Sequence, residues 1–170
     1  GVCFLRIPEG CSLRPVITGW FSEFGEVAEE KGPGVVSYGA GAGRFAGSTF
    51  DPTSHYRAAR VFRFFRDEDL GVPLLRAISR RQVDRLLDVF LDLDADPAVI
   101  SADTSFPRDG RAGFLALRAR DASGLQAALR SRGVRTDARG PWLRFGPAPY
   151  LEDRQLDDAM AALGEALTEV

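Results

Sequence analysis

The chain of 170 residues is 45% hydrophobic and has a formal net charge of −2, a composition that supports a folded core of ordinary globular size. This charge lacks the basic excess that nucleic-acid binding requires, so DNA and RNA are not expected partners. No apolar run approaches the roughly 18 residues of a membrane span, so a membrane partner is not expected either.

The two cysteines, Cys3 and Cys11, flank the turn residues "PEG". Neither a CxxC motif nor any other metal-ligand spacing is present, so no metal site is predicted. No signal-peptide pattern is visible. We therefore expect reduced thiols and a cytoplasmic location.

The N-terminal part predicts two strands followed by a loop. Residues 2–7 and 12–17 are apolar and rich in β-branched or aromatic side chains, and turn residues separate them. The chain thus opens directly on a strand, which suggests that it begins in the middle of a domain. Residues 32–49 are rich in glycine and favour an irregular loop.

Two helices are predicted next. Asp51 supplies an N-cap and Pro52 fits the first helical position, so a helix is expected over 52–66. Ser79 and Gln82 form a capping box that predicts the start of a second helix. The apolar stripe of this second helix comprises Val83, Leu86, Leu87, Phe90 and Leu91.

The composition changes at Pro97 to alternating short strands and helices, which places a small-domain boundary near Asp96. The predicted fold class is α/β, with regions 1–50, 51–96 and 97–170. The elements expected in the last region are strands over 98–102 and 113–119, a helix from the capping box of Ser123 and Gln126 to Gly133, a hairpin through 134–137 and 142–145, and a final helix that aligns Leu156, Ala159, Leu163 and Leu167.

Three short features have weak functional interpretations. The stretch "GAGRFA" at 41–46 matches a dinucleotide fingerprint, but the following helix begins too late for that fold. Lys31, the only lysine, follows three glutamates and is expected to be an exposed loop residue rather than a Schiff-base lysine. His55, the only histidine, has no nucleophile placed beside it and is expected at the surface of its helix.

Two further stretches leave a binding interpretation open. In "GSTFDP", residues 47–52, the hydroxyls of Ser48 and Thr49 precede a helix N-terminus and suit a phosphate. The alternative is an ordinary turn in which Asp51 satisfies the free donors and repels an anion. In "LRFGPAP", residues 143–149, Arg144 either points to solvent or presents its planar fork to a carboxylate, and the rigid exit that follows favours the carboxylate.

The sequence as a whole resembles a known family. The stretches "GVCFLRIPEG", "LRPVITGWF", "RFAGST", "AISRRQVDRLLDVF" and "WLRFGPAPYLEDRQLDDAM" occur in the order found in the C-terminal portion of pyridoxal-phosphate enzymes of the class V aminotransferase family, on its kynureninase-like side. The resemblance implies the C-terminal part of the fold-type-I pyridoxal-phosphate transferase fold. Residues 1–50 would end the large cofactor-binding domain, 51–96 would form connecting helices and 97–170 the small domain.

The same resemblance implies roles for particular residues. Ser48 and Thr49 would bind the phosphate of pyridoxal 5′-phosphate in the neighbouring subunit of a homodimer, and Trp20 would approach that phosphate. Arg144 would hold the α-carboxylate of an amino-acid substrate. The Schiff-base lysine would lie upstream of Gly1, so no catalytic residue is expected in this chain.

One departure from the family leaves the reaction open. Typical kynureninases continue the Gly-Trp pair with a second Trp and then Gly-His, whereas residues 19–23 here read "GWFSE". Transamination, hydrolysis, desulfuration and lyase chemistry all occur on this scaffold. The alternatives are a kynureninase hydrolase proper, a non-catalytic binding module that lacks the lysine, and a dinucleotide-binding oxidoreductase.

Overall fold

The computed structural model describes residues 2–26 and 30–169. The chain forms two compact units, one ending at Glu68 and one beginning at Asp69. None of the described helices is both long enough and apolar enough to cross a membrane. Cys3 and Cys11 are free thiols, as predicted.

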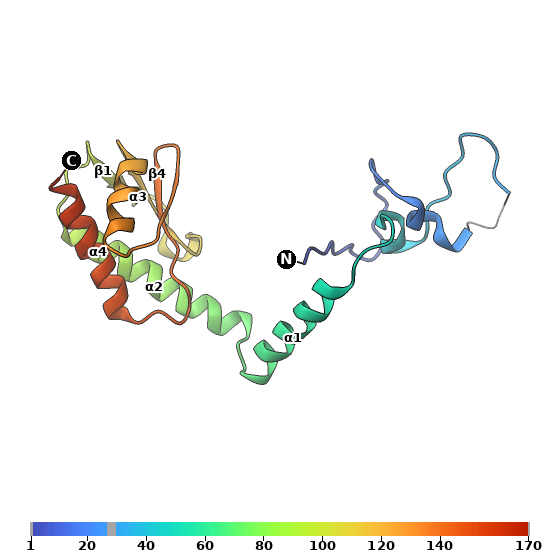
Figure 1. Cartoon of the computed structure of the whole chain (residues 1–170), viewed down its shortest axis with the longest axis horizontal. Helices are drawn as coiled ribbons and strands as arrows, with labels where there is room; N and C mark the ends of the chain where they lie inside the picture. Colours follow the sequence, from blue (N-terminus) through green and yellow to red (C-terminus); the bar gives the residue numbers. More distant parts are fainter. Residues whose placement is uncertain (1, 27–29, 170) are drawn as a thin grey trace. The chain divides into compact units, whose positions relative to one another are not determined.

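The unit that begins at Asp69 is a small layered domain of helices on a sheet (Figure 1). Its four strands are all antiparallel in the order β1-β2-β4-β3. The predicted α/β class and most of its elements are confirmed. They are α2 (Val72–Asp92), β1 (Ile100–Ala102), the short 3-10 helix η3 (Arg108–Gly110), β2 (Leu115–Ala119), α3 (Ala122–Ser131), β3 (Asp137–Arg139), β4 (Trp142–Phe145) and α4 (Asp153–Leu167).

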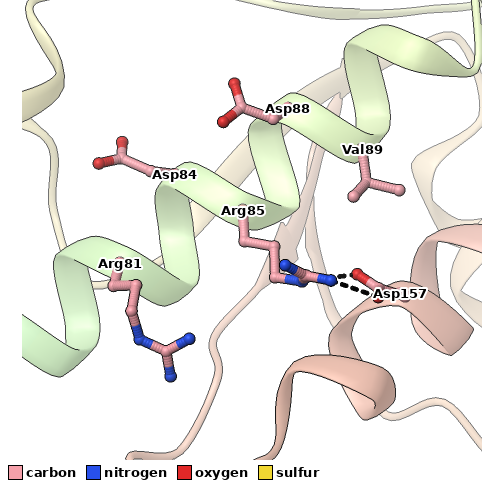
Figure 2. Close-up of a pocket in the computed structure, with 6 residues that line it drawn as sticks. All are labelled: Arg81, Asp84, Arg85, Asp88, Val89 and Asp157. Atoms are coloured by element: carbon pink, nitrogen blue, oxygen red, sulfur yellow. Dashed lines mark hydrogen bonds and ion pairs between the residues drawn. The ribbon is translucent and has the colours of Figure 1, made fainter.

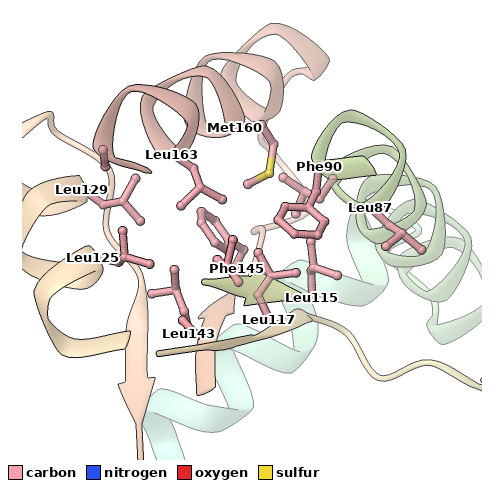
Figure 3. Close-up of a cluster of buried hydrophobic side chains, with 14 of the residues drawn as sticks. Leu87, Phe90, Leu115, Leu117, Leu125, Leu129, Leu143, Phe145, Met160 and Leu163 are labelled. Carbon is pink, nitrogen blue, oxygen red and sulfur yellow. The ribbon is translucent and has the colours of Figure 1, made fainter. Parts of the chain in front are cut away.

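One face of the sheet supplies part of the hydrophobic core. Leu115, Leu117, Leu143 and Phe145 alternate with more exposed residues along β2 and β4, as the period of a strand dictates. Their side chains meet those of α2, α3 and α4, among them Met160 (Figure 3). Among the described residues of this unit, the core helices pack on that one face, so the side chains on the opposite face, called the open face here, are available for other contacts.

The second helix starts earlier than the sequence predicted. It begins at Val72, after Gly71 as N-cap and with Pro73 in its first turn, where a proline costs no hydrogen bond. The predicted start at Ser79 is therefore wrong, because Ser79 lies inside the helix. Gln82, its expected capping partner, is fully buried instead.

The caps of the other helices of this unit also come from residues that the sequence analysis did not choose. The helix α3 is capped by Asp121, whose Oδ1 accepts a hydrogen bond of 2.8 Å from the Gly124 N–H, and not by Ser123. A genuine capping box starts α4, where Oε1 of Gln155 accepts the N–H of Glu152 at 2.9 Å. The capping motif at Ser123 therefore located α3 but not its N-cap, and the apolar stripe predicted α4 without its capping box.

In the unit that ends at Glu68, the described residues form little regular structure before the helix. The unit contains two 3-10 helices, η1 (Trp20–Glu26) and η2 (Gly41–Phe45), and the α-helix α1 (Thr53–Asp67). The strands predicted over 2–7 and 12–17 are wrong, because the described residues pair neither segment with a strand. An isolated two-stranded hairpin is marginal in water, and large side chains such as Val16 and Ile17 are more than 90% exposed.

The helix α1 matches the predicted helix over 52–66 to within one residue. The carboxylate of Asp51 accepts hydrogen bonds from the backbone and the hydroxyl of Thr53, at 2.9 and 2.7 Å, and these bonds lower the pKa of Asp51. The predicted three-way division at 50 and 96 remains a prediction. The observed packing joins α2 to α4 and β2 in the C-terminal unit.

Candidate functional site

A charged groove between α2 and α4 is the first candidate site, and its side chains already satisfy one another (Figure 2). Arg85 donates two hydrogen bonds, of 2.7 and 2.6 Å, to Asp157, and Arg81 pairs with Asp153. Asp84 and Asp88, on the other side of α2, pair with Arg108. Because each charge has an opposite partner, this groove joins elements of the fold and offers little to a ligand.

The side chain of Arg144 lies on the open face of the sheet, in a defined environment. It sits on β4, directly across from Asp137 on β3 and Ala116 on β2. Nη2 of Arg144 donates to Oδ2 of Asp137, and the guanidinium carbon lies 5.3 Å from the centre of the Phe114 ring. The side chain of Arg144 is 27% exposed. Arg144 thus alternates to the outer face of β4, as one of the two interpretations expected, but its side chain is partly covered there.

The charges around Arg144 leave a net positive site. Asp137 is shared, since Nε of Arg139 lies 3.4 Å from the same Oδ2. The hydrogen bond from Arg144 lowers the pKa of Asp137, so this carboxylate stays ionised at neutral pH. Two guanidinium groups and one carboxylate sum to one positive charge. Within the described residues, Nε and Nη1 of Arg144 donate to no other group, which leaves N–H donors for an anion.

The N-terminal unit brings two of the predicted binding stretches together. The N–H of Phe21 donates to the carbonyl of Gly47 at 2.9 Å, so the "GWF" stretch lies beside "GST". A Cβ on Gly19 would lie 2.6 Å from the carbonyl carbon of Gly47, so only glycine allows this approach. The buried Ser22 secures the turn, because its hydroxyl donates to the carbonyl of Gly19 at 2.7 Å.

Ser48 and Thr49 follow this close approach and are exposed. Within the described residues, their hydroxyls and backbone N–H groups make no hydrogen bond. Asp51 occupies the helix donor at Thr53, so a phosphate at the first turn of α1 would meet a carboxylate. Trp20 is 52% exposed, with its ring 5.3 Å from that of Phe24. Ser48 and Thr49 thus supply free donors suited to a phosphate, whereas Asp51 places a carboxylate at the helix terminus.

The weaker sequence motifs find structural explanations. Lys31 is not the exposed lysine that was predicted, because it pairs with Glu23 and its side chain is 19% exposed. His55 is exposed in the first turn of α1, as predicted. The "GAGRFA" stretch forms the short helix η2, and residues 35–38 before it form no strand. This contradicts the dinucleotide alternative, which requires a strand, a turn and a long helix.

Sequence reasoning missed two residues that organise the C-terminal unit. Asp137 was expected only as the end of a strand. Gln82 was expected at a helix start, yet its amide Nε2 reaches the carbonyls of Ala148 and Leu151 at 2.9 and 3.2 Å. The hairpin turn gave a signal for Asp137, because pairing across Gly140 and Pro141 sets residue 137 opposite residue 144.

An antiparallel sheet packed against three helices is consistent with the α/β C-terminal domain of a pyridoxal-phosphate transferase, and a family match supports this class. The sequence model of the kynureninase C-terminal domain family matches residues 75–163. This match spans more than half of the chain, and the chain belongs to that family. A comparison with curated proteins gave no significant match.

Proposed function

We propose that this chain is the C-terminal part of a kynureninase-like enzyme of the class V aminotransferase family that acts on an amino acid, with Arg144 as the ligand of the substrate α-carboxylate. The observation that carries the proposal is the setting of Arg144. Its guanidinium is held on an open sheet face, has unused N–H groups and lies in a site with one net positive charge. A planar fork of this kind suits two-point binding of a carboxylate.

The residues of the N-terminal unit fit the phosphate of pyridoxal 5′-phosphate, on which the kynureninase family depends. Ser48 and Thr49 carry free donors beside a glycine-only backbone approach, which is the donor chemistry that a phosphate requires. In the proposal these hydroxyls and Trp20 contact the phosphate held by a neighbouring subunit. When bound, the cofactor supplies an electron sink for bond cleavage at the substrate Cα. Arg144 binds and orients that substrate.

The proposed enzyme is a homodimer. The N-terminal unit exposes large apolar side chains, including Phe4, Trp20, Phe24 and Phe50, each more than half exposed. Apolar surface of this extent is typical of interfaces rather than of solvated faces. The proposed location is the cytoplasm, in keeping with two free thiols.

The residues that would recognise the substrate side chain differ from those of typical kynureninases. Glu23 stands where typical kynureninases have histidine, and its carboxylate is engaged by Lys31. Lys31 is engaged by that carboxylate, so its amine is not placed as a free Schiff-base nucleophile. The proposed enzyme therefore takes its reactive lysine from outside residues 1–170.

The test of this function is cofactor spectroscopy on the complete protein. We expect a visible absorbance band after pyridoxal 5′-phosphate is added, and a change in that band with kynurenine or another amino acid. Release of anthranilate would identify the hydrolase, and a keto acid the transaminase. Absence of any band would favour the non-catalytic binding module instead.

Gly19→Ala tests the phosphate contacts. The added Cβ would collide with the carbonyl of Gly47 and separate the "GWF" and "GST" stretches. If Ser48 and Thr49 bind the phosphate, the dissociation constant of the cofactor should rise about tenfold, the cost of losing roughly one charge-assisted hydrogen bond. Titration of the absorbance band measures this constant.

The matched control is Gly43→Ala. Gly43 lies in the same unit, and a methyl group added there would meet no heavy atom within 4 Å. This variant should therefore bind the cofactor as the wild type does. Equal affinities for the two variants would remove Ser48 and Thr49 from the phosphate site.

A further inference from the structure

The pair of Asp137 and Arg144 is placed by the sheet and not by flexible side chains alone. The two residues are directly opposed in the antiparallel pairing of β3 and β4, so both point to the open face. Asp137 is about half exposed, and an ion pair with that exposure adds little to stability. A role in the orientation of Arg144 accounts for this arrangement better than a contribution to stability does.

Three contacts restrict the guanidinium of Arg144 and its partner. Asp137 engages one terminal nitrogen, Nη2, the ring of Phe114 lies against the group, and Arg139 holds the carboxylate of Asp137 in turn. The cation–π contact limits approach from the side of the ring. The edge formed by Nε and Nη1, which donates to no described residue, is the part left for a ligand.

We propose that Asp137 is a positioning residue, which fixes the Arg144 guanidinium against Phe114 so that its remaining N–H groups are preset for a carboxylate. This inference rests on the proposed role of Arg144. In the competing role, the carboxylate of Asp137 is an internal anion that occupies the Arg144 guanidinium until the substrate carboxylate displaces it. The structure favours positioning, because Asp137 uses one of the nitrogens and is itself held by Arg139. The site also keeps a net positive charge while the pair is intact.

The experiment compares Asp137→Ala and Asp137→Asn in the complete protein. The probe is 3-phenylpropanoate, a carboxylate without a reactive amine, with its neutral amide as the reference ligand, and calorimetry gives both dissociation constants. Positioning predicts that Asp137→Ala weakens the carboxylate about three- to tenfold while the amide is unaffected, with partial rescue by asparagine, which keeps one acceptor. KM for the amino acid should rise by the same factor, with kcat little changed.

Asp157→Ala is the matched control, because Asp157 forms a two-point ion pair with Arg85 in the same unit, away from the open sheet face. It should leave both ligands unaffected. Tighter carboxylate binding by Asp137→Ala would establish the competing anion, and unchanged binding would reduce the pair to a structural contact. Either result overturns the positioning role of Asp137. If Arg144→Ala still abolishes the preference for the carboxylate over the amide, the proposed role of Arg144 stands in spite of that result. If Arg144→Ala leaves that preference intact, the proposed function fails as well.

Discussion

Arg144→Ala should lower kcat/KM for the amino-acid substrate by roughly one to two decades, since a charge-assisted hydrogen bond is worth about 1.5–3 kcal/mol. Arg144→Lys should recover only part of this loss, because an ammonium keeps the charge but not the planar two-point geometry. Cofactor affinity should stay nearly unchanged in both variants. The measurement is steady-state kinetics with an amino acid and with its decarboxylated amine.

The amine makes this test specific, because it lacks the group that Arg144 is proposed to bind. The wild type should prefer the amino acid, and Arg144→Ala should lose most of that preference. Arg118→Ala is the control: Arg118 is exposed on β2 and makes no ion pair with a described residue. A preference retained by Arg144→Ala at the wild-type ratio would contradict the carboxylate site.

The sequence predicted well the parts of the fold that follow a local residue pattern and pack on the hydrophobic core of the same unit. The hairpin around Gly140 places β4 as expected, whereas β3 begins at the last residue of its predicted range, 134–137. The helix α4 buries Leu156 and Leu163 of its predicted stripe. The strands predicted over 2–7 and 12–17 were wrong because a local pattern alone does not make a strand. Their β-branched residues suit a sheet, but a strand also needs partners, and the described residues provide none.

The candidate site was predictable in its residue types but not in its contacts. Arg144 was identified by its place inside a short buried strand that is followed by a rigid exit. Its partners depend on register and on the neighbouring strand, since Phe114 precedes β2 and lies 30 residues away in sequence. The closeness of Gly19 and Gly47 likewise depends on how two irregular segments fold, for which no periodic pattern exists.

Gln82 illustrates how a local motif can be right in residue type and wrong in role. The S-x-x-Q pattern matches a capping box, but seven further residues of α2 precede Ser79. The amide of Gln82 instead ties α2 to the segment between β4 and α4. The orientation of that amide is set by its neighbours, since only the NH₂ group can donate to two carbonyls.

Gln82→Ala should lower the free energy of unfolding by about 2–4 kcal/mol, because two hydrogen bonds of about 1 kcal/mol each are lost and a buried volume is emptied. Gln82→Met keeps most of the volume and should cost less, about 1–2 kcal/mol. Urea unfolding of the chain at neutral pH, followed by circular dichroism, measures both. Equal stability of all three proteins would show that the amide contacts do not hold the segment after β4.

Gln82→Glu separates hydrogen bonding from packing through its pH dependence. A carboxylate cannot donate to the carbonyls of Ala148 and Leu151, so burial at this position should raise the pKa of the new group above its ordinary value of about 4.3. A raised folded-state pKa means that the protonated form stabilises the fold. Stability should therefore be greatest below the unfolded-state pKa and fall as pH rises through the folded-state pKa.

The difference in unfolding free energy between Gln82→Glu and Gln82→Met, measured from about pH 4.5 to 8, cancels the titration that both variants share. Gln82→Glu should become less stable relative to Gln82→Met as pH increases. A difference that does not change with pH would mean that residue 82 reaches water and does not bind the two carbonyls.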